Sequence, residues 1–145
     1  MMNEIIHTDW VGKMAFDSEI NGHRIQFDAE EQFGGTQYGP RPKPVVLSAL
    51  AACTGMDVVS ILGKKQVKFT AFRISASGEV SENFPKYYQK IHLVYLVTGP
   101  GFKDDEEIRI KVNRSVRLSR DRYCAVSAMM KNSCEITDEI ILLDS

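Results

Sequence analysis

Residues 39–62 read GPRPKPVVLSALAACTGMDVVSIL, a proline-rich lead followed by a nearly continuous run of small and apolar side chains. Steps of four and three residues, the spacing of one helix face, separate five of them: Val45, Ala49, Ala52, Met56 and Val59. Further leucines, valines and isoleucine make the predicted helix, 45–62, apolar nearly all round. Such a helix is typical of the centre of a protein. Pro44 suits its first turn, and we expect Gly63 with Lys64-Lys65 to end it.

The segment before this helix predicts strands and then an irregular loop. Residues 4–10 are expected to form an edge strand. An antiparallel hairpin is predicted to join residues 12–20 to residues 23–28, because Asn21-Gly22 favours the tight turn that such hairpins need. Residues 30–44 carry three glycines and three prolines, which predicts a loop without regular structure.

The segment after the helix predicts a second set of strands. Two long strands, 67–80 and 87–98, are expected to join around residues 83–85. In the second strand, apolar side chains alternate with others at every second position: Ile91, Leu93, Tyr95 and Val97.

The last third of the chain predicts two more helices and a closing strand. Four acidic residues at 104–107 favour the first turn of a helix that ends near Arg120. A short helix, 124–131, and a strand, 134–143, complete the pattern. Strands at the beginning, middle and end indicate an α+β fold, with antiparallel sheets around one central helix in a single domain, 1–145.

Composition narrows the function classes. The chain has 145 residues, 43% hydrophobic and 26% charged, with a formal net charge of −1. We therefore expect one globular domain, with neither nucleic acid nor an anionic membrane as partner. We see no secretion signal and no uninterrupted apolar stretch near the roughly 20 residues that span a bilayer. Three cysteines, an odd number, argue against a disulfide-stapled secreted scaffold and favour the cytoplasm.

The cysteines are the candidate chemical groups. Cys53 lies in the helix among small neighbours, where it is either a buried small hydrophobe or a reactive thiol that needs a nearby cation. Cys124 lies at the predicted start of the short helix, where free N–H groups favour a thiolate and Arg120 and Arg122 would add to the effect. The alternative for Cys124 is a hydrophobic cap residue. Cys134 is interpreted as structural.

Other chemistries find less support. Metal ligands would have to come from distant segments, namely from the three cysteines and from His7, His23 and His92, because no Cys-x-x-Cys or His-x-x-x-His pair occurs. No glycine-rich phosphate loop follows a predicted strand. We expect neither a metal nor a cofactor.

Two segments resemble a known family. Residues 39–62, quoted above, resemble the central-helix motif of the OsmC-like family, which includes osmotically induced protein C and the organic hydroperoxide resistance proteins. Residues 122–129, RYCAVSAM, resemble its second cysteine motif. The order of the predicted elements is also similar, so the resemblance covers nearly the whole chain.

The resemblance implies a fold, an assembly and a reaction. The fold would be the α+β fold of that family, and the working unit an intertwined homodimer with active sites at the subunit interface. The reaction would be thiol-dependent reduction of organic hydroperoxides or peroxides. Cys53 would become a sulfenic acid, Cys124 would condense with it to a disulfide, and an external thiol or dithiol would reduce that disulfide.

One departure from the family pattern bears on activity. Members use an arginine to stabilise the thiolate and often a carboxylate to hold that arginine. Lys43 or Pro44 stands where the acid is usually found, and we expect no acid of the loop to replace it. Arg41 is the first candidate for the cation and Arg24 the second, although Arg41 also fits a solvated loop charge. Residues 39–42, GPRP, and residues 53–59, CTGMDVV, resemble a less-characterised branch of the family. The missing acid leaves as alternative an OsmC-like dimer with little peroxidase activity that binds a small ligand in the interface cleft.

Overall fold

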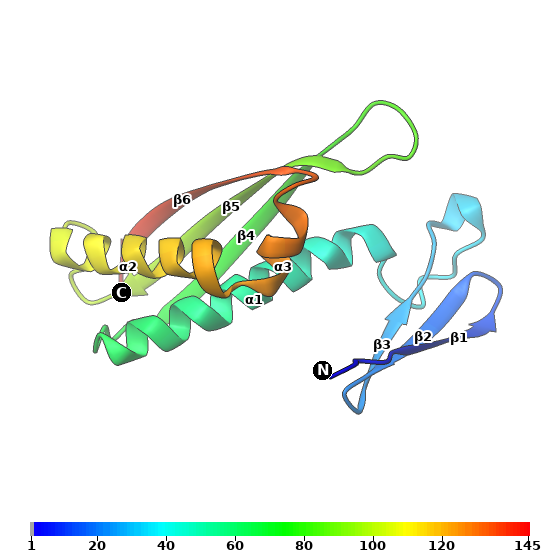
Figure 1. The fold of residues 1–145 in the computed structure, drawn as a ribbon, viewed down its shortest axis with the longest axis horizontal. Coiled ribbons are helices and arrows are strands. Elements are labelled where there is room, and N and C mark those ends of the chain that lie inside the picture. Colours follow the sequence, from blue (N-terminus) through cyan, green and yellow to red (C-terminus); the bar gives the residue numbers. More distant parts are fainter. Residues whose placement is uncertain (1) are drawn as a thin grey trace. The chain divides into compact units, whose positions relative to one another are not determined.

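The computed structural model describes residues 2–145. The chain divides into two compact units, Met1–Val46 and Leu47–Ser145. The long helix α1 (Pro42–Lys64) starts in the first unit and ends in the second (Figure 1). The assignment of a single domain to residues 1–145 stays a prediction.

The first unit contains a three-stranded antiparallel sheet in the order β1-β2-β3. Its strands are β1 (His7–Gly12), β2 (Ala15–Ile20) and β3 (His23–Phe27). Asn21 and Gly22, with φ of 52° and 80°, form the turn between β2 and β3, so the predicted hairpin is confirmed. The expected edge strand over residues 4–10 is β1, which begins at His7 and continues to Gly12.

The loop after β3 is more ordered than predicted. A short 3₁₀ helix, η1 (Glu31–Phe33), interrupts it. The Asp28 carboxylate accepts hydrogen bonds from the backbone N–H groups of Ala29, Thr36 and Tyr38 at 2.8, 2.8 and 3.1 Å. Gly35 permits the tight return, because a Cβ atom there would lie 1.8 Å from the Ala29 carbonyl oxygen.

The second unit contains a three-stranded sheet in the order β4-β5-β6 (Figure 1). Its strands are β4 (Ala71–Val80), β5 (Tyr88–Gly99) and β6 (Glu135–Asp144). β4 and β5 pair antiparallel, but β5 and β6 pair parallel. The prediction of purely antiparallel sheets is therefore wrong. A helical crossover between β5 and β6 returns the chain to the end where β5 began, which gives the two strands the same direction.

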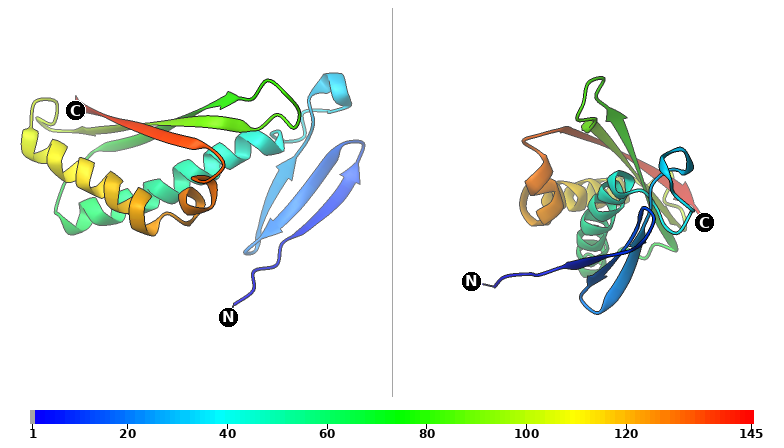
Figure 2. Two further views of the ribbon diagram at one scale, coloured as in Figure 1. Left: turned by 45° about the horizontal axis from the view of Figure 1, so that its top comes forward. Right: turned by 90° about the vertical axis from the view of Figure 1, so that its right-hand side faces the viewer.

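Helices cover one face of this sheet (Figure 2). They are α1, α2 (Glu106–Leu118) and α3 (Ala125–Met130), with a π-helical turn, η2 (Ser119–Tyr123), between the last two. The predicted alternation in β5 is confirmed, since every second side chain from Ile91 to Val97 is fully buried. The core joins these side chains to others from α1 and α2: Leu50, Val58, Leu62, Val112 and Val116. Asp105 caps α2 by accepting a hydrogen bond from the Ile108 N–H.

Helix α1 departs from its prediction at both ends and over most of its surface. It begins at Pro42 and passes through Gly63 to Lys64, so Gly63 is not a cap. Only one stripe is buried, formed by Leu50, Thr54, Val58 and Leu62. Met56 and Val59 are 72% and 44% exposed. A single chain therefore leaves most of this apolar helix uncovered, and the prediction that the protein interior surrounds it is wrong for one chain.

By length and composition alone, α1 could also cross a membrane. An 18-residue window has a mean hydropathy of 2.0, and 22% of that window is buried. The sequence analysis found no uninterrupted apolar stretch long enough to span a bilayer. That statement still holds, because Asp57 interrupts the apolar residues of α1. The same two properties, length and apolarity, also occur in helices that a second protein chain covers.

Candidate active site

The structure brings Cys53 and Cys124 together across 71 residues of sequence. Cys53 lies in the middle of α1 and is half-buried, while Cys124 is the N-cap of α3 and only 2% exposed. Cys53 packs against the core cluster that contains Cys124, and it is near enough to raise the pKa of the Cys124 thiol. The second unit thus holds two neighbouring free thiols, one partly open to solvent and one enclosed.

The Cys124 thiol is not the thiolate that its position predicts. Its sulfur accepts a hydrogen bond from the Ser127 N–H at 3.4 Å, as expected for a helix start. Burial is the main cause that nevertheless raises the pKa of Cys124 to about 11; the bond from Ser127 lowers the pKa, and the neighbouring Cys53 and Asp57 contribute to raising it. Desolvation outweighs the helix start, so Cys124 carries its proton at neutral pH.

Neither arginine near Cys124 in sequence serves it as the predicted cation. The Arg120 guanidinium donates to the Asp138 carboxylate and, at 2.6 Å, to the Ile136 carbonyl oxygen, so it is bound to β6. Arg122 lies 5.9 Å from the centre of the Tyr123 ring. The expectation that Arg120 and Arg122 favour a thiolate at Cys124 is therefore wrong.

A buried chain of polar side chains lies beside the thiols and was missed by sequence reasoning. The Tyr95 hydroxyl bonds to the Thr54 hydroxyl, and Ser119 Oγ bonds to both Thr54 Oγ1 and Asp57 Oδ2, each at 2.8 Å. Burial is the main cause that raises the pKa of Tyr95 to about 12, so its hydroxyl stays protonated. One signal was available: Asp57 follows Cys53 by four residues, which puts both on one side of α1.

Cys134 has structural surroundings. Its thiol donates a hydrogen bond to the Met130 carbonyl oxygen at 3.4 Å, and burial raises its pKa. No second thiol is recorded as its partner among the described residues. The structural interpretation of Cys134 agrees with these contacts.

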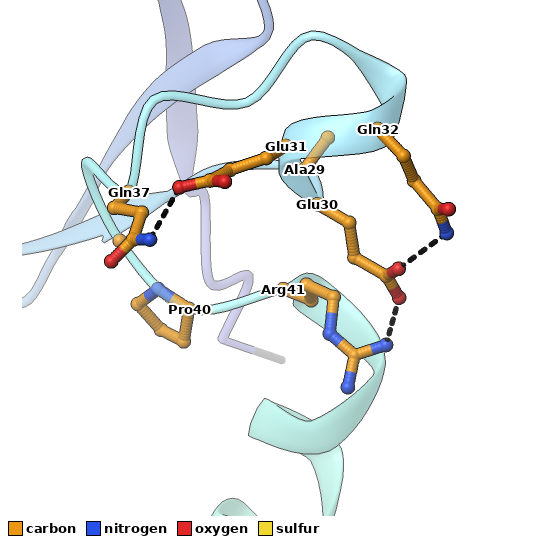
Figure 3. A pocket seen from close by; sticks show the side chains of 8 residues that line it. Ala29, Glu30, Glu31, Gln32, Gln37, Pro40 and Arg41 are labelled. Atoms are coloured by element: carbon orange, nitrogen blue, oxygen red, sulfur yellow. Dashed lines mark hydrogen bonds and ion pairs between the residues drawn. The ribbon is translucent and has the colours of Figure 1, made fainter.

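Arg41, the first candidate cation, lies in the first unit beside a carboxylate that sequence reasoning excluded. Its guanidinium contacts Glu30 Oε1 at 2.6 Å, and Gln32 donates to the other Glu30 oxygen at 2.8 Å (Figure 3). The pair borders an open pocket of about 610 Å³. The expectation that no loop acid replaces the missing one is wrong, because the turn at 28–36 folds Glu30 back toward Arg41. Arg24, the second candidate, pairs with Asp17 at 3.6 Å on the surface.

An apolar groove of about 580 Å³ lies between α1 and β4 in the second unit. Met56 and Val59 from α1 and Phe72 and Ile74 from β4 line it, together with small side chains of α1. Gly55 also lines the groove and lets α1 approach β4 closely, since a Cβ atom there would lie 3.1 Å from the tip of Ile74. Met56 and Met129 are exposed, whereas Leu50 belongs to the core.

Within residues 2–145, no group of three or more His, Cys, Asp or Glu side chains is arranged to hold a metal ion. The polar groups that converge near the thiols are hydroxyls and one carboxylate.

Comparisons with known proteins agree along nearly the whole chain. A protein-family model described as OsmC-like protein matches residues 34–139. Protein YhfA of Escherichia coli strain K12 is 33% identical over 129 residues, which are 88% of this chain and 90% of YhfA. A hypothetical protein from Aquifex aeolicus VF5 superposes with a TM-score of 0.79 and 26% identity over 98% of both chains. The organic hydroperoxide resistance protein OhrB of Bacillus subtilis shares the fold, with a TM-score of 0.64 and 14% identity over 96% of this chain and 98% of its own.

Proposed function

The chain belongs to the OsmC-like family, and from that premise we propose that it is a two-cysteine thiol peroxidase that reduces organic hydroperoxides. One observation carries the proposal: two free thiols from distant parts of the sequence are neighbours in the fold, and the one in α1 is the more exposed. The family also includes proteins named for organic hydroperoxide resistance, such as OhrB. The relative YhfA carries no activity in its name.

The proposed reaction uses the two thiols in sequence. The Cys53 thiolate attacks the outer oxygen of a hydroperoxide R–O–O–H, the O–O bond breaks, and the alkoxide takes a proton and leaves as the alcohol. Cys53 is then a sulfenic acid. The Cys124 sulfur attacks the Cys53 sulfur, the S–O bond breaks, and the hydroxyl leaves as water with the proton of Cys124. An external thiol or dithiol reduces the disulfide by exchange and is itself oxidised.

Arg41 is the proposed cation that stabilises the Cys53 thiolate, and Glu30 is the proposed carboxylate that holds Arg41. A guanidinium near a sulfur favours its ionised form, and a carboxylate bonded to the guanidinium fixes its orientation. The Glu30–Arg41 contact of 2.6 Å supports this assignment, because it supplies the carboxylate that the loop was expected to lack. The alternative, a ligand-binding dimer with little peroxidase activity, was based on the absence of such a carboxylate, and the activity test below separates the two functions.

The proposed working unit is a homodimer with active sites at the subunit interface, in the cytoplasm. The exposed apolar face of α1 supports a partner chain, because large uncovered apolar surfaces mark interaction sites. The groove between α1 and β4 is the proposed place for the apolar tail of the hydroperoxide.

Steady-state reduction of cumene hydroperoxide with excess dithiol tests the proposal on the wild type, Cys53→Ser and Cys124→Ser. Cys134→Ser is the matched control. We expect two thiols oxidised per chain, a Cys53–Cys124 disulfide by peptide mass mapping, no turnover in Cys53→Ser, and a sulfenic acid that dimedone traps in Cys124→Ser. Oxidation of Cys134 with Cys53 still reduced would refute the mechanism. A wild type that oxidises once without recycling would support the alternative.

A further inference from the structure

Two positions on α1, one helical turn apart, lie against the segment formed by η2 and Cys124. At the first position Cys53 lies near Cys124, and at the second Ser119 donates a hydrogen bond to Asp57 at 2.8 Å. Ser119 is the first residue of η2 and is fully buried, and Cys124 follows its last residue. The Cys124 N–H donates to the Ser119 carbonyl oxygen at 2.7 Å, which closes the turn. The position of Ser119 against α1 therefore determines where the Cys124 sulfur lies.

Three buried hydroxyls connect this network to Asp57. A carboxylate only accepts hydrogen bonds, so Ser119 Oγ donates to Asp57 Oδ2. Ser119 Oγ is also placed to donate to Thr54 Oγ1, and the Thr54 hydroxyl is bonded in turn to the Tyr95 hydroxyl. Asp57 is thus the acceptor at one end of a connected set of three hydroxyls. Tyr95, Thr54 and Ser119 are all fully buried, so this chain has no water to replace a lost partner.

We propose that Asp57 is a positioning residue of the thiol pair, which acts by holding Ser119, and through it η2, so that the Cys124 thiol stays against Cys53. This assignment rests on the proposed function, because it gives the second thiol its place in the disulfide-forming step. The Asp57 carboxylate has a second effect through its charge, because a negative group near Cys124 disfavours the thiolate there. Other groups also face Cys124: the Cys53 thiol from α1, the Ser127 N–H from α3 and Tyr95 from β5, itself near Asp138 and Arg120.

The retained proton has a use in the proposed reaction. When the Cys124 sulfur forms the S–S bond, the S–O bond of the Cys53 sulfenic acid breaks and the departing hydroxyl needs one proton to become water. Cys124 loses one proton in the same step. A carboxylate that keeps this proton on Cys124 until the sulfenic acid has formed therefore supplies the proton where it is needed.

The test uses the reduced full chain with Asp57→Asn and Ser119→Ala, and Asp121→Asn as the matched control. Asp121 is an exposed carboxylate in the same turn η2. Two measurements avoid peroxide: the rate of Cys53–Cys124 disulfide formation with diamide, and a titration of the cysteine ¹³Cβ NMR signals. Circular dichroism checks the fold of each variant.

We expect disulfide formation to slow roughly 10- to 100-fold in Ser119→Ala and in Asp57→Asn, since small displacements of reacting groups have effects of this size. In Asp57→Asn the titration midpoint of Cys124 should also fall, because a negative charge is lost. Asp121→Asn should match the wild type. Wild-type rates of disulfide formation and an unchanged Cys124 midpoint in both variants would overturn the inference. If Asp57→Asn does not fold, the rate of disulfide formation in Ser119→Ala decides the test alone. A wild type that forms the disulfide with diamide but reduces no hydroperoxide would instead refute the proposed function.

Discussion

At the scale of single residues, Asp28 organises the loop that holds the candidate cation. Its carboxylate gathers three backbone N–H groups, and its own N–H donates to the Pro40 carbonyl oxygen at 3.1 Å. The bonds from Thr36 and Tyr38 are the largest causes that hold the pKa of Asp28 below its usual value. The loop that places Glu30 beside Arg41 therefore depends on one ionised side chain.

Asp28→Asn should loosen this loop, because an amide has only one acceptor oxygen where the carboxylate has two. We expect hydrogen exchange at the Thr36 and Tyr38 amides to accelerate on the order of tenfold, the effect of a lost hydrogen bond. A lowered carboxyl pKa contributes stability that is complete above the unfolded value near 3.8 and is lost as the pH falls through the folded value. The variant and the wild type should therefore differ at pH 6 and converge in strong acid. Equal exchange rates at pH 6 would contradict this account.

The candidate site could be predicted only in part at this scale. The cysteine motifs lie in continuous stretches of sequence, so both thiols were identified before any coordinates. Glu30 was missed because it reaches Arg41 through the return of a loop, which depends on Asp28 and Gly35 rather than on spacing. Helix position predicted a thiolate at Cys124, but burial decides its protonation, and burial depends on elements distant in sequence.

At the scale of elements, two glycines of α1 differ in what surrounds them. Gly55 faces β4, where a Cβ atom would lie 3.1 Å from Ile74, whereas Gly63 has open space. Gly63→Ala should raise the free energy of unfolding by up to about 1 kcal/mol, because alanine favours a helix more than glycine does. Gly55→Val should lower it by about 1–3 kcal/mol, the usual cost of overpacking.

Denaturant unfolding at one fixed protein concentration checks both values, since a dimer would link stability to concentration. For Gly55→Ala we expect a free energy of unfolding between those of the other two variants, because the gain in helix propensity is offset by the need to displace the tip of Ile74. If Gly55→Val raised the free energy of unfolding as much as Gly63→Ala does, β4 would not pack closely on α1.

Helices and strands were predicted well where neighbouring residues in the sequence determine them. The hairpin from β2 to β3 follows from Asn21-Gly22, and the buried side of β5 follows from strict alternation. The direction of β6 was not predictable from its own residues, because it depends on the crossover through α2, η2 and α3. The π-helical turn also has no local signature, although it sets the contact between Ser119 and Cys124.

At the scale of the whole molecule, the sequence of α1 specifies more burial than one chain provides. The apolar pattern predicted that other elements of the chain would surround α1. In the structure, the sheet β4-β5-β6 and the neighbouring helices bury only one stripe of it. Met56 and Val59, which also line the groove, remain on the uncovered side. A second copy of the chain would cover this face, consistent with the proposed homodimer, and would enclose the groove that the proposed substrate tail enters.

Met56→Glu with Val59→Lys should therefore convert the proposed dimer to a monomer without unfolding it, because both side chains are exposed in a single chain. We expect sedimentation equilibrium to give twice the chain mass of 16.3 kDa for the wild type and the single mass for the double variant. The matched control is Ile110→Lys, which changes an exposed apolar side chain of α2 that lies outside the groove. Peroxide turnover should fall with dissociation if each active site needs both subunits. A wild type of single mass at micromolar concentration would rule out the homodimer and leave the face of α1 to another partner.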